Sequence, residues 1–162
     1  MRAVRVAIAA LIGLAFWYFV APLYAPVTKA LARPFVPLVF GRGFQLGGDP
    51  DAIVYTPDGL IAARVFMGYV TTNLITLIAL FGLARHPLSA SNLGRCAISI
   101  ICLIPVHAAA VLIVAKSFVA PPGSLWGNAA QAYAVFTCHA ISFAIWWVLR
   151  PPDPSLDLAE AT

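Results

Sequence analysis

Four long apolar stretches constrain this chain more than any other feature of its sequence. They cover residues 4–23, 62–84, 96–118 and 130–149, and no Asp or Glu lies inside any of them. A helix of about 20 apolar residues crosses a hydrocarbon layer about 30 Å thick. The pattern predicts an all-α integral membrane bundle of about four transmembrane helices. We expect one membrane domain over residues 1–150 and a cytoplasmic tail over residues 151–162.

The composition agrees with a membrane protein. Hydrophobic residues make up 62% of the chain and charged residues 10%, whereas soluble domains average about 45–50% and about 25%. The net charge of +4 is explained by basic residues at membrane boundaries, without a polyanionic partner. These values exclude an ordinary cytosolic globule, a disordered chain and a nucleic-acid-binding domain. Membrane lipid is therefore the first expected partner.

The distribution of basic residues predicts the orientation. The short loop between the second and third stretches carries Arg85 and Arg95, while residues 119–129 carry no charge. Short loops rich in Lys and Arg stay in the cytoplasm, so we expect both termini there, in the cell (inner) membrane. The first stretch is longer than the apolar region of a typical signal peptide, so we expect an uncleaved anchor.

Residues 25–61 form the one sizeable segment outside the four stretches, and we expect them on the extracytoplasmic side. A short amphipathic helix should begin near Thr28 and be interrupted by Pro34 and Pro37. Residues 52–56 and 60–64 then read as a β-hairpin around a Pro-Asp-Gly turn. The segment's three aspartates lack the spacing of a calcium loop; they are Asp49, Asp51 and Asp58.

Polar residues inside the apolar stretches mark candidate sites, because unpaired polar groups are costly in lipid. The second stretch carries a polar set that is a candidate interaction face: Tyr69, Thr71, Thr72, Asn73 and Thr76. The simpler interpretation is packing inside the bundle, in which Asn73 finds one partner across it. Tyr24, just after the first stretch, reads as an interfacial aromatic residue.

His107 and His139 give a second hypothesis. Each lies near the middle of its stretch, and consecutive spans are antiparallel, so the two imidazoles could meet and hold a b-type haem. A zinc site that adds Cys102 and Cys138 is not expected, because adjacent residues of a helix project about 100° apart. We therefore expect no metal site and no cofactor, with the bis-histidine haem protein as the alternative.

A membrane enzyme of unknown chemistry using Tyr69, Asn73 and His107 is the third hypothesis. Nucleophilic catalysis needs a nucleophile, a base and an anion stabiliser at one place. Cys96 follows Arg95, but both are expected at the cytoplasmic end, away from His107. The sequence therefore predicts no catalytic residues and a protein that is not an enzyme.

The layout of residues 25–150 resembles the core of the exosortase/archaeosortase family of membrane transpeptidase-like enzymes. A Pro- and Arg-containing segment precedes the extended residues 52–64, and the chain continues through a Trp-containing loop to Trp146-Trp147-Val148-Leu149-Arg150. The family's catalytic residues are missing. Tyr69 stands where the family has its nucleophilic Cys, residues 107–110 contain no Arg, and residues 128–131 contain no His.

Without these residues, the chain is similar to the small exosortase (H-type)-associated membrane proteins. This resemblance implies a non-catalytic accessory protein of an exosortase-type protein-sorting system. Its expected partner is an exosortase-like enzyme or the C-terminal helix of a substrate that carries a sorting signal.

Overall fold

The computed structural model describes residues 2–84, 87–136 and 140–150. The described part is mostly helical and contains one small sheet. The predicted tail, residues 151–162, lies outside the described residues.

The first helix, α1 (Arg2–Ala32), is longer than its apolar stretch and continues through Pro22 and Pro26. The prediction of an amphipathic helix that begins near Thr28 is therefore wrong. Thr28 lies inside α1, where its Oγ1 donates a hydrogen bond to the carbonyl oxygen of Tyr24, 3.1 Å away. The predicted interruption at Pro34 is confirmed, because α1 is followed by a 3₁₀ turn, η1 (Arg33–Phe35), and then by α2 (Val36–Phe40). Pro37 does not interrupt the helix, since it lies in the first turn of α2.

The small sheet has three antiparallel strands in the order β1-β2-β3. Strands β2 (Ala52–Tyr55) and β3 (Ile61–Val65) form the predicted hairpin, with Val54 opposite Ala63. Strand β1 (Gln45–Gly47) was not expected. Its three residues lie among glycines and are too few to show an alternating pattern.

The second apolar stretch is divided between a strand and two helices. Its first residues belong to β3, and α3 (Met67–Val70) and α4 (Asn73–Gly82) follow. Residues 62–65 were thus wrongly assigned to a transmembrane helix. Ala63 and Val65 are apolar because they face the core from one side of β3. Apolar residues in a strand therefore extended the apolar stretch and were read as part of a helix.

The third stretch forms α5 (Ala90–Val119), with Ser89 as its N-cap and Pro105 inside. The fourth stretch contains α6 (Leu125–Phe136) and α7 (Ser142–Leu149). In the described part of the chain, two helical segments are long and apolar enough to cross a membrane, Val6–Phe40 and Ala90–Val119. Four such helices are not shown among the described residues: the second stretch is divided, and residues 137–139 of the fourth lie outside the described residues.

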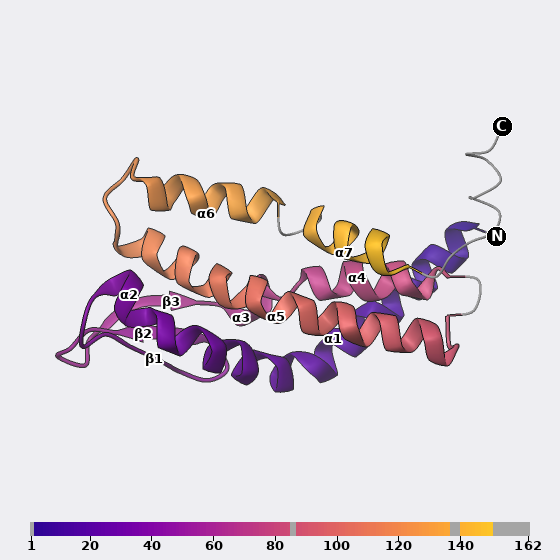
Figure 1. Ribbon diagram of the computed structural model, residues 1–162, viewed down its shortest axis with the longest axis horizontal. Helices are drawn as coiled ribbons and strands as arrows, with labels where there is room; N and C mark the ends of the chain where they lie inside the picture. Colours follow the sequence, from indigo (N-terminus) through magenta and orange to yellow (C-terminus); the bar gives the residue numbers. More distant parts are fainter. Residues whose placement is uncertain (1, 85–86, 137–139, 151–162) are drawn as a thin grey trace.

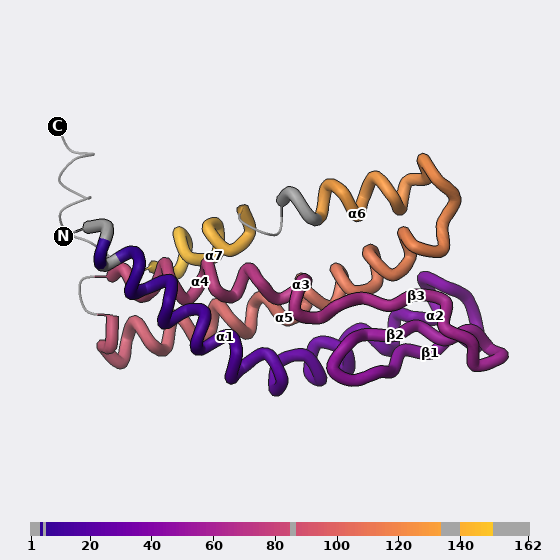
Figure 2. The backbone as a smooth tube through the Cα atoms, turned by 180° about the vertical axis from the view of Figure 1, so that it is seen from behind, coloured from indigo at the N-terminus to yellow at the C-terminus, as the bar shows by residue number. Residues whose placement is uncertain are grey.

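The molecule is elongated, with α5 running along most of its length (Figure 1). α1 packs against α4 and α5. The sheet and α6 lie beside the C-terminal half of α5, and α4 and α7 beside its N-terminal half (Figure 2). The described residues form two hydrophobic cores. One joins the sheet to residues 108–115 of α5, and the other joins α1, α4 and Leu103 of α5.

Candidate functional site

A buried polar cluster lies where the two cores meet, and His107 is its centre. Leu103 belongs to one core and Ala108 to the other, and the side chain of His107 is fully buried between them. The hydroxyl of Tyr24 lies 2.8 Å from Nδ1 of His107. Oδ1 of Asn73 lies 2.7 Å from Nε2. The cluster therefore joins α1, α4 and α5 through one imidazole.

These contacts fix the tautomer of His107. The amide oxygen of Asn73 can only accept a hydrogen bond, so Nε2 carries the proton and donates it. Nδ1 is then the acceptor, and the hydroxyl of Tyr24 donates to it. Both ring nitrogens of a neutral imidazole are thereby satisfied, as a buried histidine requires.

The cluster extends to two neighbouring elements through backbone and side-chain contacts. Oγ of Ser142, the first residue of α7, donates to the carbonyl oxygen of Asn73 at 3.2 Å. Beside it, Nε1 of Trp17 donates to Oγ1 of Thr71 at 3.1 Å, and Thr71 donates to the carbonyl oxygen of Met67 at 2.8 Å. Side chains thus bridge α1, α3, α4, α5 and α7 at one level.

The helices are irregular at this same level. Thr71 and Thr72 separate α3 from α4, α1 contains Pro22 and Pro26 near Tyr24, and Pro105 of α5 precedes His107 by two residues. A break in a helix leaves backbone groups without their usual partners. Across the α3–α4 break, the N–H groups of Leu74 and Ile75 donate to the carbonyl oxygens of Thr71 and Thr72. The polar side chains of the cluster therefore lie at the level where the helices are irregular.

The predicted polar face of the second stretch is split by the structure. Thr71 and Asn73 are buried and belong to the cluster. Tyr69 points outward with 65% of its surface exposed, Thr72 is also exposed, and Thr76 is half-buried. The five residues do not form one surface. The expectation that Asn73 finds a partner across the bundle is confirmed by its bond to His107.

The structure gives no geometric support to a metal or haem at His107, because both ring nitrogens are held by protein groups. His139 and Cys138 lie outside the described residues. Within residues 2–84, 87–136 and 140–150, no group of three or more His, Cys, Asp or Glu could hold a metal ion. Of the three aspartates considered for calcium, Asp51 instead pairs with Arg64 at 2.7 Å.

The hypothetical enzyme site is only partly assembled. Asn73 and His107 are in contact, but Tyr69 is on the outer surface, and Tyr24 occupies the third position. The sequence did not identify Tyr24, Trp17 or Ser142 as members of the polar cluster around His107. Tyr24 was interpreted as an interfacial aromatic residue, because the first helix was expected to end at residue 23. A continuous α1 carries Tyr24 into the interior instead.

A second polar contact set fixes the sheet to α1. Lys29 is buried, and its Nζ donates to the carbonyl oxygens of Gly48 at 2.7 Å and Asp51 at 3.4 Å. Nε of Arg33 donates to the carbonyl oxygen of Leu46 at 3.2 Å. We call these three contacts the Lys29 clasp. Lys29 is the basic residue of the last turn of α1, and Arg33 begins the following turn, η1.

No family model, curated protein or solved structure matches this chain.

Proposed function

We propose that the chain is an integral membrane protein in which four segments form the bundle: α1, α3–α4, α5 and α6–α7. The surface of the long helices supports this. In Val6–Phe40, only 11% of an apolar 18-residue window is buried inside the molecule. In Ala90–Val119, 39% of such a window is buried. A core helix of a soluble protein would be mostly buried. Apolar surface of this extent is stable when lipid covers it.

The ends of the bundle support the same placement. The guanidinium of Arg150 lies 3.6 Å from the ring centre of Trp147, next to Trp146 at the end of α7. Aromatic and basic side chains of this kind gather at membrane interfaces. The first turns of α1 and the last turn of α7 lie at the same end of the molecule (Figure 1), which supports placing both on the same side of the membrane.

Within the membrane, we propose a non-catalytic role. The observation that carries it is the satisfied state of His107, whose two ring nitrogens bind Tyr24 and Asn73. A general base needs a nitrogen within reach of a substrate proton. Cys96 and Cys102 are free, but the nearby Arg95 donates to the carbonyl oxygens of Leu149 and Arg150 instead. The cluster is suited to holding helices together.

The resemblance described above supplies the system in which this protein acts. We propose that it is an accessory protein of an exosortase-type sorting system, contacting an exosortase-like enzyme or a sorting-signal helix within the bilayer. Tyr69 and Thr72, which face outward, are available for such a contact. A partner helix in lipid is held mainly by close packing and by a few hydrogen bonds.

The test uses a host that carries the sorting system, with this chain deleted and then restored. Deletion should leave the sorting substrate uncleaved at its C-terminal signal, and restoration should recover processing. A variant with Cys96, Cys102 and Cys138 all replaced by Ser should recover it equally well at the same protein level. Normal processing in the deletion host contradicts the accessory role. Failure of the triple variant alone means that a thiol does chemistry.

A further inference from the structure

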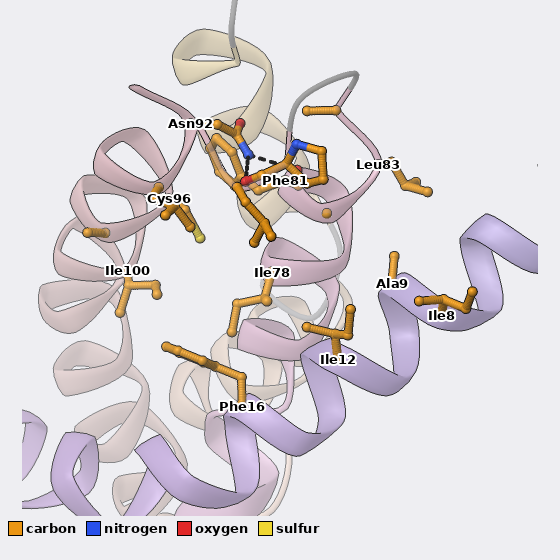
Figure 3. Close-up of a pocket in the computed structure, with 16 residues that line it drawn as sticks. Ile8, Ala9, Ile12, Phe16, Ile78, Phe81, Leu83, Asn92, Cys96 and Ile100 are labelled. Carbon is orange, nitrogen blue, oxygen red and sulfur yellow. Dashed lines mark hydrogen bonds between the residues drawn. The ribbon is translucent and has the colours of Figure 1, made fainter. Parts of the chain in front are cut away.

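A cavity of about 590 Å³ lies between the first half of α1, the end of α4 and the beginning of α5 (Figure 3). Its volume falls in the range of ligand sites, about 300–1,000 Å³. Its walls are almost wholly apolar, and they include Ile8, Ile12 and Phe16 of α1, Phe81 of α4, and Leu93 and Ile100 of α5. It is separate from the His107 cluster.

The cavity is polar at one end only. Asn92 lies at the end near the α4–α5 connection, and Phe16 lies at the opposite end (Figure 3). Asn92 is 2% exposed, and its Nδ2 donates to the carbonyl oxygens of Phe81 at 3.0 Å and Pro87 at 2.9 Å. Its Oδ1 is buried and accepts no hydrogen bond among the described residues. A buried acceptor without a donor is costly.

We propose that this cavity binds one acyl chain of a membrane lipid, with an O–H or N–H group at the lipid's polar end donating to Oδ1 of Asn92. The proposal rests on the membrane location proposed above. The mouth of the cavity is flanked by exposed apolar residues such as Ile12 and Leu88, so it opens onto hydrocarbon. Asn92 is the third residue of α5, at the helix end, where headgroups lie.

An apolar helix of a partner, or a second copy of this chain, fits these observations less well. The backbone N–H groups inside a helix are already bonded within it, and an apolar face brings no donor to Asn92. A lipid has its apolar and polar parts in the same order as the walls of the cavity. The acyl chain of the lipid therefore lies toward Phe16 and Ile100, and the hydrogen-bond donor at its polar end lies toward Asn92.

The test compares two tryptophan variants of the full chain. Ala97 lines the cavity and is exposed, whereas its neighbour Ile98 is exposed outside it. Purified protein is exchanged into detergent with palmitoyl-oleoyl phosphatidylethanolamine, and bound lipid is counted by native mass spectrometry. The unaltered protein and Ile98→Trp should each retain one lipid, and Ala97→Trp at least about tenfold less. Equal retention by both variants, or none by any protein, overturns the proposal.

The headgroup contact is tested with a lipid that lacks a donor. Phosphatidylcholine with the same chains should bind the unaltered protein about fivefold more weakly, the usual effect of one hydrogen bond. Asn92→Leu should remove this difference. Equal binding of the two lipids by the unaltered protein contradicts the bond to Asn92. The tryptophan pair remains decisive if Asn92→Leu fails to fold.

Two further measurements separate the other outcomes. A dimer that binds no lipid and dissociates in Ala97→Trp would make a second copy the occupant and overturn the proposal. Resistance of all variants to alkaline carbonate extraction checks the membrane location itself. If the unaltered protein is extracted, the membrane location fails. If it resists extraction and binds no lipid, the lipid proposal alone fails.

Discussion

His107 shows how one side chain can hold three helices in an apolar surrounding. Its tautomer is set by Asn73, and its second nitrogen is satisfied by Tyr24. Removing one partner leaves the other group buried and unpaired, which costs more than the bond itself contributes. The cluster therefore makes the packing of α1, α4 and α5 interdependent.

Tyr24→Phe tests this interdependence. The change removes one hydroxyl and leaves Nδ1 of His107 without a donor, so the free energy of unfolding should fall by about 1–3 kcal/mol. Thermal unfolding of the purified protein in detergent measures the loss. Tyr69→Phe is the matched control, because Tyr69 is exposed, and it should change stability by less than about 0.5 kcal/mol. Equal effects of the two changes would show that the Tyr24 hydroxyl does not support the fold.

Asn73 and Thr72 are neighbours with opposite expected effects. Asn73→Leu removes the acceptor for Nε2 of His107, and should lower the melting temperature by a few degrees, corresponding to about 1–2 kcal/mol. Thr72→Leu, on the exposed side, should leave the melting temperature unchanged and weaken co-purification with a sorting partner. Stability and co-purification are measured on one preparation. If Thr72→Leu melts early and still co-purifies fully, Thr72 closes the bundle and the partner contact lies elsewhere.

For single residues, the sequence predicted which polar positions matter better than it predicted their hydrogen-bond partners. Asn73 and His107 were identified because they interrupt apolar stretches. Tyr24 was not, since its role depends on α1 continuing past Pro22 and Pro26. A proline in a helix interior usually ends or bends it, and only packing against α4 and α5 explains why α1 continues. That packing is a long-range property which no local pattern reports.

At the scale of elements, the short strands and broken helices carry the main differences from the predicted fold. The hairpin was predictable from its Pro-Asp-Gly turn, and β1 was not. The division of the second stretch at Thr71 and Thr72 has no strong sequence signal, because these residues are tolerated inside helices. Beside the break, Trp17 and Ser142, which come from distant parts of the chain, donate hydrogen bonds to Thr71 and Asn73.

The Lys29 clasp gives a prediction at the same scale. Lys29→Met keeps the aliphatic stem and removes the donor to the carbonyl oxygens of Gly48 and Asp51. Hydrogen bonds from a charged group contribute about 1.5–3 kcal/mol, so amide hydrogens of β1 and β2 should exchange at least about tenfold faster. Hydrogen–deuterium exchange with mass spectrometry reads this directly. Arg42→Met, at an exposed basic residue near the same sheet, should leave the exchange rates unchanged. Unchanged exchange in Lys29→Met would show that the sheet is held by apolar packing alone.

For the whole molecule, the central claim is that the bundle crosses a membrane along α5. Its 30 residues give a helix about 45 Å long, which exceeds the hydrocarbon thickness of about 30 Å. The two ends of α5 should therefore lie on opposite sides. The sheet, β1 to β3, accompanies the C-terminal half of α5 (Figure 2) and should lie on the extracytoplasmic side.

The most direct test of this claim is to measure on which side of the membrane each end of α5 lies. Single cysteines replace Ser91, at the beginning of α5, or Leu125, the first residue of α6 after the loop that follows α5. The background has the three native cysteines changed to Ser, and both positions are exposed. A membrane-impermeant maleimide is applied to intact cells and then to permeabilised cells. The account predicts labelling of Leu125→Cys in intact cells and of Ser91→Cys only after permeabilisation. Identical labelling of the two positions in intact cells would contradict a membrane-spanning α5.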